Sequence, residues 1–264
     1  MSRSVKGTAV ITGASTGIGA VYAERLARRG YDLVLVARDA ARLQAQAAKF
    51  QAFGVKAESL PADLTRREDR AALERRLEED AAITLLVNNA GMAVNGPLAS
   101  NDPDALERMV ELNVVAVTRL AAAAARAFST RKQGTIVNIA SVLALAPERF
   151  NGVYSGTKAF VLALSQSMQQ ELGPLGIQVQ AVLPGATRTE IWDRSGMSVS
   201  DLPAEMLMEA DEMVDAALSG LDQKEAITIP SLPDIADWQR LTEARFALGP
   251  NLSRNHAAAR YSQA

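Results

Sequence analysis

The chain has 264 residues, of which 48% are hydrophobic and 22% are charged, with a formal net charge of −2. This composition is typical of a globular protein that can bury its own core, and it shows no basic excess that would favour nucleic acid. Cysteine is absent and histidine occurs once, as His256, which excludes disulfides and thiolate metal sites and argues against a histidine-ligated metal or a Ser-His dyad.

We also expect no signal peptide and no apolar run of about 18 residues that could span a membrane. These expectations together predict a cytoplasmic protein with no membrane or nucleic-acid partner.

Apolar runs and helical patterns alternate along most of the chain. In order, the pattern predicts strand Thr8–Ile11, helix Gly17–Arg29, strand Leu33–Ala37, a helix to Phe53 capped by Asp39, strand Val55–Leu60, helix Arg66–Asp80, strand Leu85–Asn88, helix Pro103–Arg131, strand Thr135–Ile139, helix Val153–Leu172, strand Ile177–Leu183 and edge strand Ile227–Ile229. Strands separated by helices of this length predict an α/β fold with parallel β-α-β units in one doubly wound sheet.

The segment Ile191–Ala210 follows a Pro-Gly and mixes Trp192 and several methionines with polar residues. It predicts a mobile substrate lid at about residues 190–212. The tail, about residues 230–264, is a weakly patterned helical extension that packs either on the domain or on a neighbouring subunit. No break in composition marks a second domain, so we expect a single domain over residues 1–264.

A glycine-rich turn, Thr12–Gly19, joins the first strand to the first helix. Gly13 permits the tight turn, Gly17 lets the backbone approach a pyrophosphate, and Gly19 allows the helix to pack closely on the sheet. The N–H groups and positive dipole end of the helix favour phosphate, although a mere turn is the alternative. The expected cofactor-binding residues of this turn are Gly13, Ser15, Thr16, Gly17, Ile18 and Gly19.

Arg38 ends the second strand, where an acidic residue would accept hydrogen bonds from the ribose 2′-hydroxyl of NADH. An arginine at this place can make paired contacts with a 2′-phosphate instead. We therefore predict that NADPH is preferred over NADH. Arg42, one helical turn further on, is expected to contribute to phosphate binding. The alternative is a surface arginine at a strand end.

Tyr154 and Lys158 are four residues apart in a predicted helix, which places a phenol beside an ammonium. A free tyrosine ionises near pH ~10, and moving its pKa to about 7 requires about 4 kcal/mol at roughly 1.36 kcal/mol per unit. A close cation in a partly dry pocket can supply much of this. Taken alone, the spacing is weak evidence, because such pairs arise by chance on many helices and a surface tyrosine packing on a lysine stem also explains it.

Taken together, these motifs resemble the short-chain dehydrogenase/reductase family over roughly residues 8–229. The matching residues are Thr12–Gly19, Asp63-Leu64, Asn88-Asn89-Ala90-Gly91, Asn113, Ser141, Tyr154, Lys158, Pro184-Gly185 and Thr189. The resemblance implies a single Rossmann-type domain with a mostly parallel seven-stranded sheet, helices on both faces and NADP(H) as the cofactor. The run from Tyr31 to Arg38 looks like that of a broad NADPH-using branch.

The resemblance also implies roles for these residues. Tyr154 would be the general acid and base, Ser141 would hold the carbonyl oxygen, Lys158 would lower the tyrosine pKa and bind ribose hydroxyls, and Asn113 would support a proton-relay water. The remaining cofactor contacts would be Asp63 and Leu64 at the adenine, Asn89, Ala90 and Gly91 at the ribose and diphosphate, Pro184 and Gly185 at the nicotinamide, and Thr187 and Thr189 at its carboxamide and phosphates. Asn88 is as well explained as a brace between strands.

The resemblance therefore implies reversible reduction of a small-molecule ketone or aldehyde. We expect the substrate pocket to be formed by residues 92–98, 142–150 and the lid. Its apolar side chains favour a hydrophobic substrate, while Arg149, Arg188 and Arg194 leave an anionic tail open. The alternatives are the family's redox-inactive lyase-type relatives and a non-catalytic dinucleotide sensor or scaffold. The resemblance also implies a homodimer or homotetramer.

Overall fold

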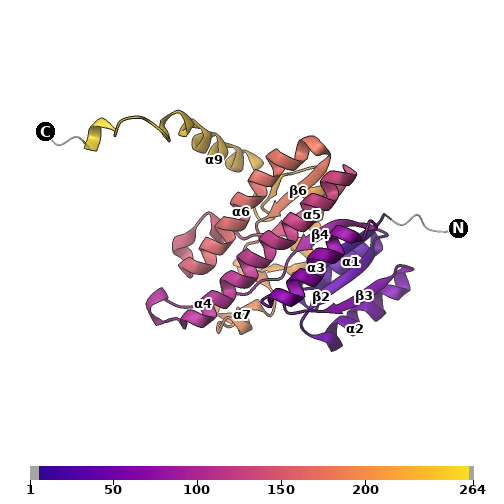
Figure 1. Ribbon diagram of the computed structural model, residues 1–264. Coiled ribbons are helices and arrows are strands. Elements are labelled where there is room, and N and C mark those ends of the chain that lie inside the picture. The colour runs from indigo at the N-terminus through magenta and orange to yellow at the C-terminus, as the bar shows by residue number, and fades with distance from the viewer. Residues whose placement is uncertain (1–5, 262–264) are drawn as a thin grey trace. The chain divides into compact units, whose positions relative to one another are not determined.

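The computed structural model describes residues 6–261, without the side chain of Arg194. Contacts within the chain group the residues up to Pro230 into one compact unit and those from Ser231 onward into a second. The first unit holds all of the strands and all but the last of the long helices (Figure 1). The single-domain organisation stays a prediction.

A seven-stranded sheet forms the centre of the first unit. From edge to edge its strands are β3 (Ala57–Pro61), β2 (Asp32–Ala37), β1 (Thr8–Thr12), β4 (Ile83–Asn88), β5 (Gly134–Ile139), β6 (Ile177–Val182) and β9 (Ile227–Thr228). All six neighbouring pairs are parallel. The order changes direction between β1 and β4, the point at which doubly wound sheets bind ligands. The predicted fold is confirmed, with a sheet that is wholly parallel.

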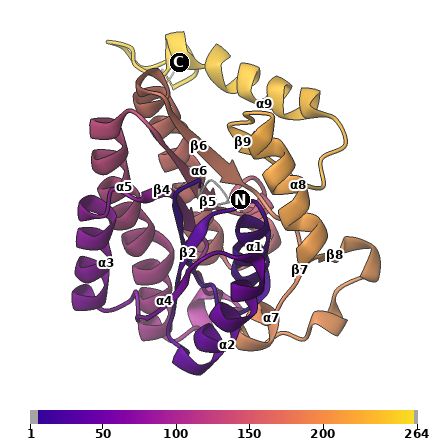
Figure 2. The same ribbon diagram turned by 90° about the vertical axis from the view of Figure 1, so that its right-hand side faces the viewer.

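Helices cover both faces of the sheet (Figure 2). One layer consists of α1 (Gly17–Arg28), α2 (Ala40–Phe50) and α8 (Ala210–Asp222), and the other of α3 (Arg67–Glu79), α5 (Val117–Arg131) and α6 (Gly152–Leu172). Ala9 and Ile11 of β1 pack with the first layer, and Val10 between them packs with the second. Because successive strand residues point to opposite faces and both faces are covered, the strands are apolar throughout.

The predicted helix Pro103–Arg131 consists of α4 (Pro103–Val110), a π-helical stretch (Glu111–Ala116) and α5. A window of it reaches a mean hydropathy of 1.2, so by length and composition it could cross a membrane. The expectation that the chain lacks such a run is wrong by that criterion. The helix is this apolar because it packs in the core: Leu120, Ala124 and Phe128 are buried in the cluster that also holds residues of the sheet and of α3.

The chain after β6 contains elements that the sequence pattern did not predict. Strands β7 (Thr187–Arg188) and β8 (Met208–Glu209) pair as a separate two-stranded parallel sheet, with the short helix α7 (Ile191–Arg194) between them. Helix α8 follows directly and was also not predicted. Met213, Val214, Ala217 and Leu218 form its buried stripe.

The second unit contains helix α9 (Ile235–Ala247). Asp234 caps the start of this helix, because its side chain accepts a hydrogen bond from the Ala236 N–H. The predicted helical extension is therefore confirmed. No residue of α9 is buried in the part of the chain that the structure describes.

Candidate active site

The predicted site residues lie on loops that leave the carboxyl ends of neighbouring parallel strands. Gly13 follows β1, Arg38 follows β2, Asn89 follows β4, Ser141 follows β5 and Pro184 follows β6. Because all of these strands run in the same direction, their carboxyl ends meet at one edge of the sheet. The fold therefore gathers the predicted residues at that edge.

The glycine-rich turn is tied to the loop after β4 by side-chain hydrogen bonds. The Thr12 hydroxyl accepts from the backbone N–H groups of Asn89 and Ala90, each at 2.9 Å. The Asn89 amide donates to the carbonyls of Thr12 at 2.9 Å and Gly13 at 3.3 Å. The Asn89 side chain thus braces the turn, and its neighbour Asn88 braces β4 against β5 by donating to Asn138 at 3.0 Å.

Three glycines of the turn are fixed by geometry. Gly13 and Gly17 have positive φ values of +68° and +54°, which favour glycine. A side-chain carbon at Gly19 would lie only 2.3 Å from the carbonyl oxygen of Gly13, so α1 could not pack this closely with any other residue there. A carbon at Gly17 would meet the Thr189 side chain at 3.1 Å, which shows that Thr189 faces the turn.

The start of α1 is open to an anion. Its N-cap residue, Thr16, makes no side-chain capping hydrogen bond, and the first turn holds no acidic residue. The first N–H groups of a helix have no partner within the helix. Together with the glycine turn, these groups form a cradle that fits a phosphate.

The end of β2 carries positive charge toward the loop after β3. Arg38 is exposed and forms no hydrogen bond or salt bridge within residues 6–261. Asp63 accepts from the Thr65 N–H at 3.0 Å and the Thr65 hydroxyl at 2.7 Å. Burial opposes ionisation of Asp63, but those hydrogen bonds and the nearby charges of Arg38 and Arg66 lower its pKa overall.

Helix α6 presents Tyr154 and Lys158 because of how it begins. Asn151 caps it by accepting from the N–H groups of Val153 at 3.0 Å and Tyr154 at 3.1 Å. The Asn151 amide also donates to the Gly96 carbonyl at 2.9 Å, which joins the helix start to the loop after β4. Asn151 was not predicted as a site residue, although an asparagine directly before a predicted helix is a recognisable signal.

Asn113 and Lys158 are buried beside one another. Asn113 lies in the π-helical stretch, donates to the carbonyl of Met92 at 2.9 Å and to the Thr157 hydroxyl at 3.1 Å, and accepts from the Met92 N–H. The Lys158 ammonium donates to the Ile139 carbonyl at 2.9 Å. Gly91 faces both groups, because a carbon on it would lie 3.3 Å from the Asn113 oxygen and 3.6 Å from the Lys158 nitrogen.

The pKa values of the pair are both shifted. Burial raises the pKa of Tyr154 to about 12, and a hydrogen bond with Ser141 opposes the rise. Burial also lowers the pKa of Lys158 to about 8. The Lys158 nitrogen lies 5.8 Å from the centre of the Tyr154 ring and is directed at a backbone carbonyl. That Lys158 lowers the tyrosine pKa stays a prediction, because the causes resolved for the Tyr154 pKa shift are burial and the Ser141 hydrogen bond.

The loop after β6 closes the site on its other side. Ser141 accepts from the Leu143 N–H at 3.1 Å and lies 3.5 Å from the Pro184 carbonyl. Thr187 donates to the Gly185 carbonyl at 3.2 Å. These contacts bring Ser141, Pro184, Gly185 and Thr187 together next to Tyr154. Leu64 lies on the loop after β3 instead and is buried in the core cluster that includes α3.

Three aromatic rings connect Tyr154 to the predicted lid. Phe150 meets Tyr154 edge-on at 5.5 Å between ring centres and meets Trp192 edge-on at 6.5 Å. Edge-to-face contacts at these distances are favourable. Trp192 is fixed in turn by its N–H, which donates to the Thr187 carbonyl at 2.8 Å.

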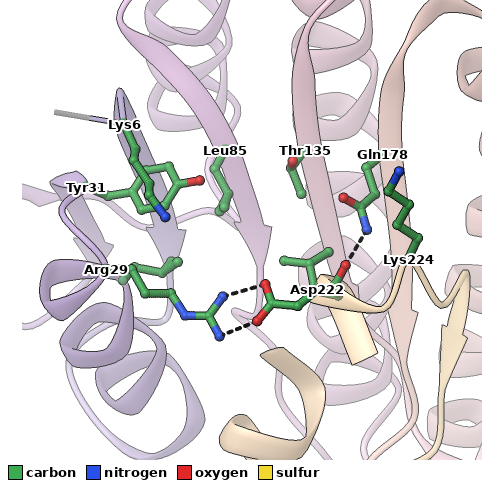
Figure 3. A pocket seen from close by; sticks show the side chains of 10 residues that line it. Lys6, Arg29, Tyr31, Leu85, Thr135, Gln178, Asp222 and Lys224 are labelled. Atoms are coloured by element: carbon green, nitrogen blue, oxygen red, sulfur yellow. Dashed lines mark hydrogen bonds and ion pairs between the residues drawn. The ribbon is translucent and has the colours of Figure 1, made fainter. Parts of the chain in front are cut away.

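A pocket of about 250 Å³ lies at the opposite edge of the sheet (Figure 3). It is lined by residues at the amino ends of strands, among them Tyr31, Thr135 and Gln178. Arg29 and Asp222 form a two-point ion pair across it, with both contacts at 2.8 Å. This pair joins the end of α1 to the end of α8, and the pocket lies away from the carboxyl edge where the predicted site residues meet.

Comparisons with known proteins agree with this geometry. A family model described as short chain dehydrogenase matches residues 7–198. A short-chain dehydrogenase from Sphingobium yanoikuyae, solved in complex with NADPH, is 55% identical over 97% of this chain and 100% of its own, with a TM-score of 0.94. The bulky-bulky ketone specific alcohol dehydrogenase from Comamonas testosteroni is 47% identical over 97% and 99%, with a TM-score of 0.90.

The similarity extends to curated proteins. The 17-beta-hydroxysteroid dehydrogenase type 3 of Homo sapiens is 32% identical over 221 residues, which are 82% of this chain and 69% of that protein. A doubly wound parallel sheet with a glycine-rich turn and a Tyr-Lys pair at its carboxyl edge defines a class of oxidoreductases. The chain belongs to the short-chain dehydrogenase family.

Proposed function

We propose that the protein is an NADP(H)-dependent reductase that converts the carbonyl of a bulky, apolar ketone or aldehyde to an alcohol, reversibly. The observation that carries the proposal is the convergence of Ser141, Tyr154, Lys158 and Asn113 beside the glycine-rich turn at one sheet edge. The family membership and the NADPH complex of the similar Sphingobium enzyme support it.

The residues present fit the cofactor. The uncapped start of α1 and the glycine cradle would hold the diphosphate, and Arg38, without a salt bridge in the described chain, would bind the 2′-phosphate. Asp63 at the adenine, Gly91 at the ribose, and Pro184, Gly185, Thr187 and Thr189 toward the nicotinamide complete the proposed site. When bound, the cofactor supplies a hydride to the carbonyl carbon.

The chain's own groups handle the proton. Because the pKa of Tyr154 is raised to about 12, its hydroxyl is protonated at neutral pH and can donate to the oxygen that becomes the alcohol. Ser141, hydrogen-bonded to Tyr154, can donate to the same oxygen and position it. The Lys158 cation, close to Asn113 and Gly91, would stabilise the phenolate left behind.

The proposed substrate class rests on the segments predicted to form the pocket. Leu98, Leu145 and Met206 are large apolar side chains that are 67%, 40% and 56% exposed, and each comes from one of the three segments predicted to form the pocket. Phe150 and Trp192 add an aromatic wall. Arg188 is paired with Glu209 at 2.8 Å, so it is less suited to an anionic tail. The name of the similar Comamonas enzyme, specific for bulky-bulky ketones, supports a large apolar substrate.

The test is a panel of carbonyl compounds, followed by the loss of NADPH absorbance. Ketones with bulky apolar groups on both sides should react faster than sugars or charged acyl-thioester ketones. Tyr154→Phe should lower turnover by about 10²–10⁴-fold, the range of general acid catalysis, while NADPH binding measured by fluorescence stays nearly unchanged. Binding of NADPH without oxidation by any carbonyl would refute the reductase and favour a sensor. The cytoplasmic location and the homodimer or homotetramer remain part of this proposal.

A further inference from the structure

An ion pair spans the two sides of the proposed coenzyme site. The Arg42 guanidinium, on the first turn of α2, contacts both carboxylate oxygens of Glu190 at 2.9 and 3.1 Å. Its Nε lies 3.4 Å from Asp39, the residue that caps α2. Arg42 and Glu190 are 148 positions apart, so only the fold brings them together.

The position of Glu190 places its charge next to the proposed phosphate contacts. It follows Thr189, whose side chain faces Gly17 of the glycine-rich turn. It also occupies the N-cap position of α7, the helix that carries Trp192, without a capping hydrogen bond from its side chain. A carboxylate here projects from the β6 side of the site toward the end of β2, where the 2′-phosphate is expected to bind.

Arg38, at the end of β2, and Arg42, on α2, therefore differ in their ion pairing. Arg38 has no salt bridge within residues 6–261, whereas Arg42 is engaged by two carboxylates. Both partners of the Arg42–Glu190 pair are about half exposed, at 49% and 45%. Exposed pairs of this kind are weak, so a nearby phosphate competes for the guanidinium at a cost of only a few-fold in affinity.

We propose that Glu190 is a specificity-determining residue that limits the preference for NADPH by holding Arg42 away from the 2′-phosphate. The inference rests on the proposed function, in which the adenosine end binds beside Arg38. Two physical effects act in the same direction. Glu190 occupies the guanidinium that would otherwise pair with the phosphate, and its own negative charge repels a phosphate dianion.

The test is Glu190→Gln, which keeps the size of the side chain and removes its charge. Dissociation constants for NADPH and NADH are measured by fluorescence titration, so no carbonyl substrate is needed. NADPH should bind about two- to fivefold more tightly, the range that an exposed ion pair supports, while NADH changes little. In an Arg42→Ala background the same substitution should give a smaller gain, because the two residues act together.

Glu209→Gln is the matched control. Glu209 is an exposed carboxylate in a 2.8 Å ion pair with Arg188, and its replacement changes the net charge by the same amount. It should leave the ratio of the two constants unchanged. An equal shift for both coenzymes in Glu190→Gln, or a gain undiminished by Arg42→Ala, would overturn the inference. Failure of the parent protein to bind NADPH at all would instead sink the proposed function.

Discussion

The glycine-rich turn and the segment from β7 to β8 border the same site but are built in different ways. The turn is fixed by Thr12, Asn89 and three glycines, through backbone contacts and partly buried hydrogen bonds. In the segment from Arg188 to Ala210 no residue is buried, the undescribed side chain of Arg194 aside. Few buried contacts mean that local opening costs little free energy.

Side chains rather than a core hold that second segment. Trp192 bonds to Thr187, Arg188 pairs with Glu209, and Glu190 pairs with Arg42. The proposed cofactor side of the site is therefore rigid and intolerant of change, whereas the proposed substrate side is adjustable. Variants on the two sides should differ in kind.

The largest effect is expected from Gly19→Ala, on the rigid side. Alanine is the better helix former, but its methyl would lie 2.3 Å from the Gly13 carbonyl oxygen, so backbone must move. We expect a loss of about 1–3 kcal/mol in the free energy of unfolding, as for other overpacked sites, and about tenfold or greater weakening of NADPH binding.

Gly156→Ala is the control for that substitution. Gly156 lies in α6, and a carbon added to it would meet nothing within 4 Å. Here the gain in helix propensity should dominate, with stability unchanged or raised by about 0.5–1 kcal/mol. Chemical denaturation of both variants measures the difference. Equal stability of the two would mean that the turn is softer than its contacts indicate.

The next effect is a pH dependence set by Lys158. Burial lowers its pKa to about 8, so the cation is present below that pH and is lost above it. The pKa of Tyr154 is raised to about 12, so the tyrosine stays protonated throughout. The kcat/KM of carbonyl reduction should therefore fall by about tenfold per pH unit above about pH 8.

Lys158→Arg distinguishes this explanation from others, because a guanidinium stays charged across the whole range. Whatever activity this variant retains should lack the fall above about pH 8. NADPH binding, titrated over the same range, separates coenzyme loss from chemistry. An identical decline in the parent protein and the variant would show that some other group titrates.

The rigid side was largely predictable from the sequence because its signals are local. Strand, glycine turn and helix follow one another within Thr8–Arg28, and Asp39 caps α2 as expected. Asn113 is a poor helix former inside the predicted helix Pro103–Arg131, and the structure places it in a π-helical stretch. The buried stripe of α8 has a helical spacing in the sequence as well, so that helix was missed despite a usable signal.

The remainder depends on contacts that no local pattern encodes. Strands β7 and β8 are two residues each, too short for any periodicity, and pair across the lid. The Arg42–Glu190 pair and the Asn89 brace join distant segments. Helical spacing gives the proximity of Lys158 to Tyr154 but not the burial that raises the pKa of Tyr154 and lowers the pKa of Lys158.

The smallest effect is expected on the adjustable side, from Trp192→Phe. The substitution keeps an aromatic ring opposite Phe150 but removes the N–H that donates to Thr187. A typical hydrogen bond contributes about 0.5–1.5 kcal/mol, so the lid should loosen and the KM for a bulky ketone should rise by about two- to tenfold. NADPH affinity and the pH profile should not move, because the turn and Lys158 are untouched.

Tyr31→Phe serves as the matched aromatic control, since it removes a hydroxyl at the opposite edge of the sheet. Its KM values should equal those of the parent protein. If Trp192→Phe weakened NADPH as strongly as it weakened the ketone, the two sides of the site would be coupled. The lid would then belong to the rigid side of the site, because a segment that adjusts independently cannot transmit the loss of one hydrogen bond to the glycine-rich turn.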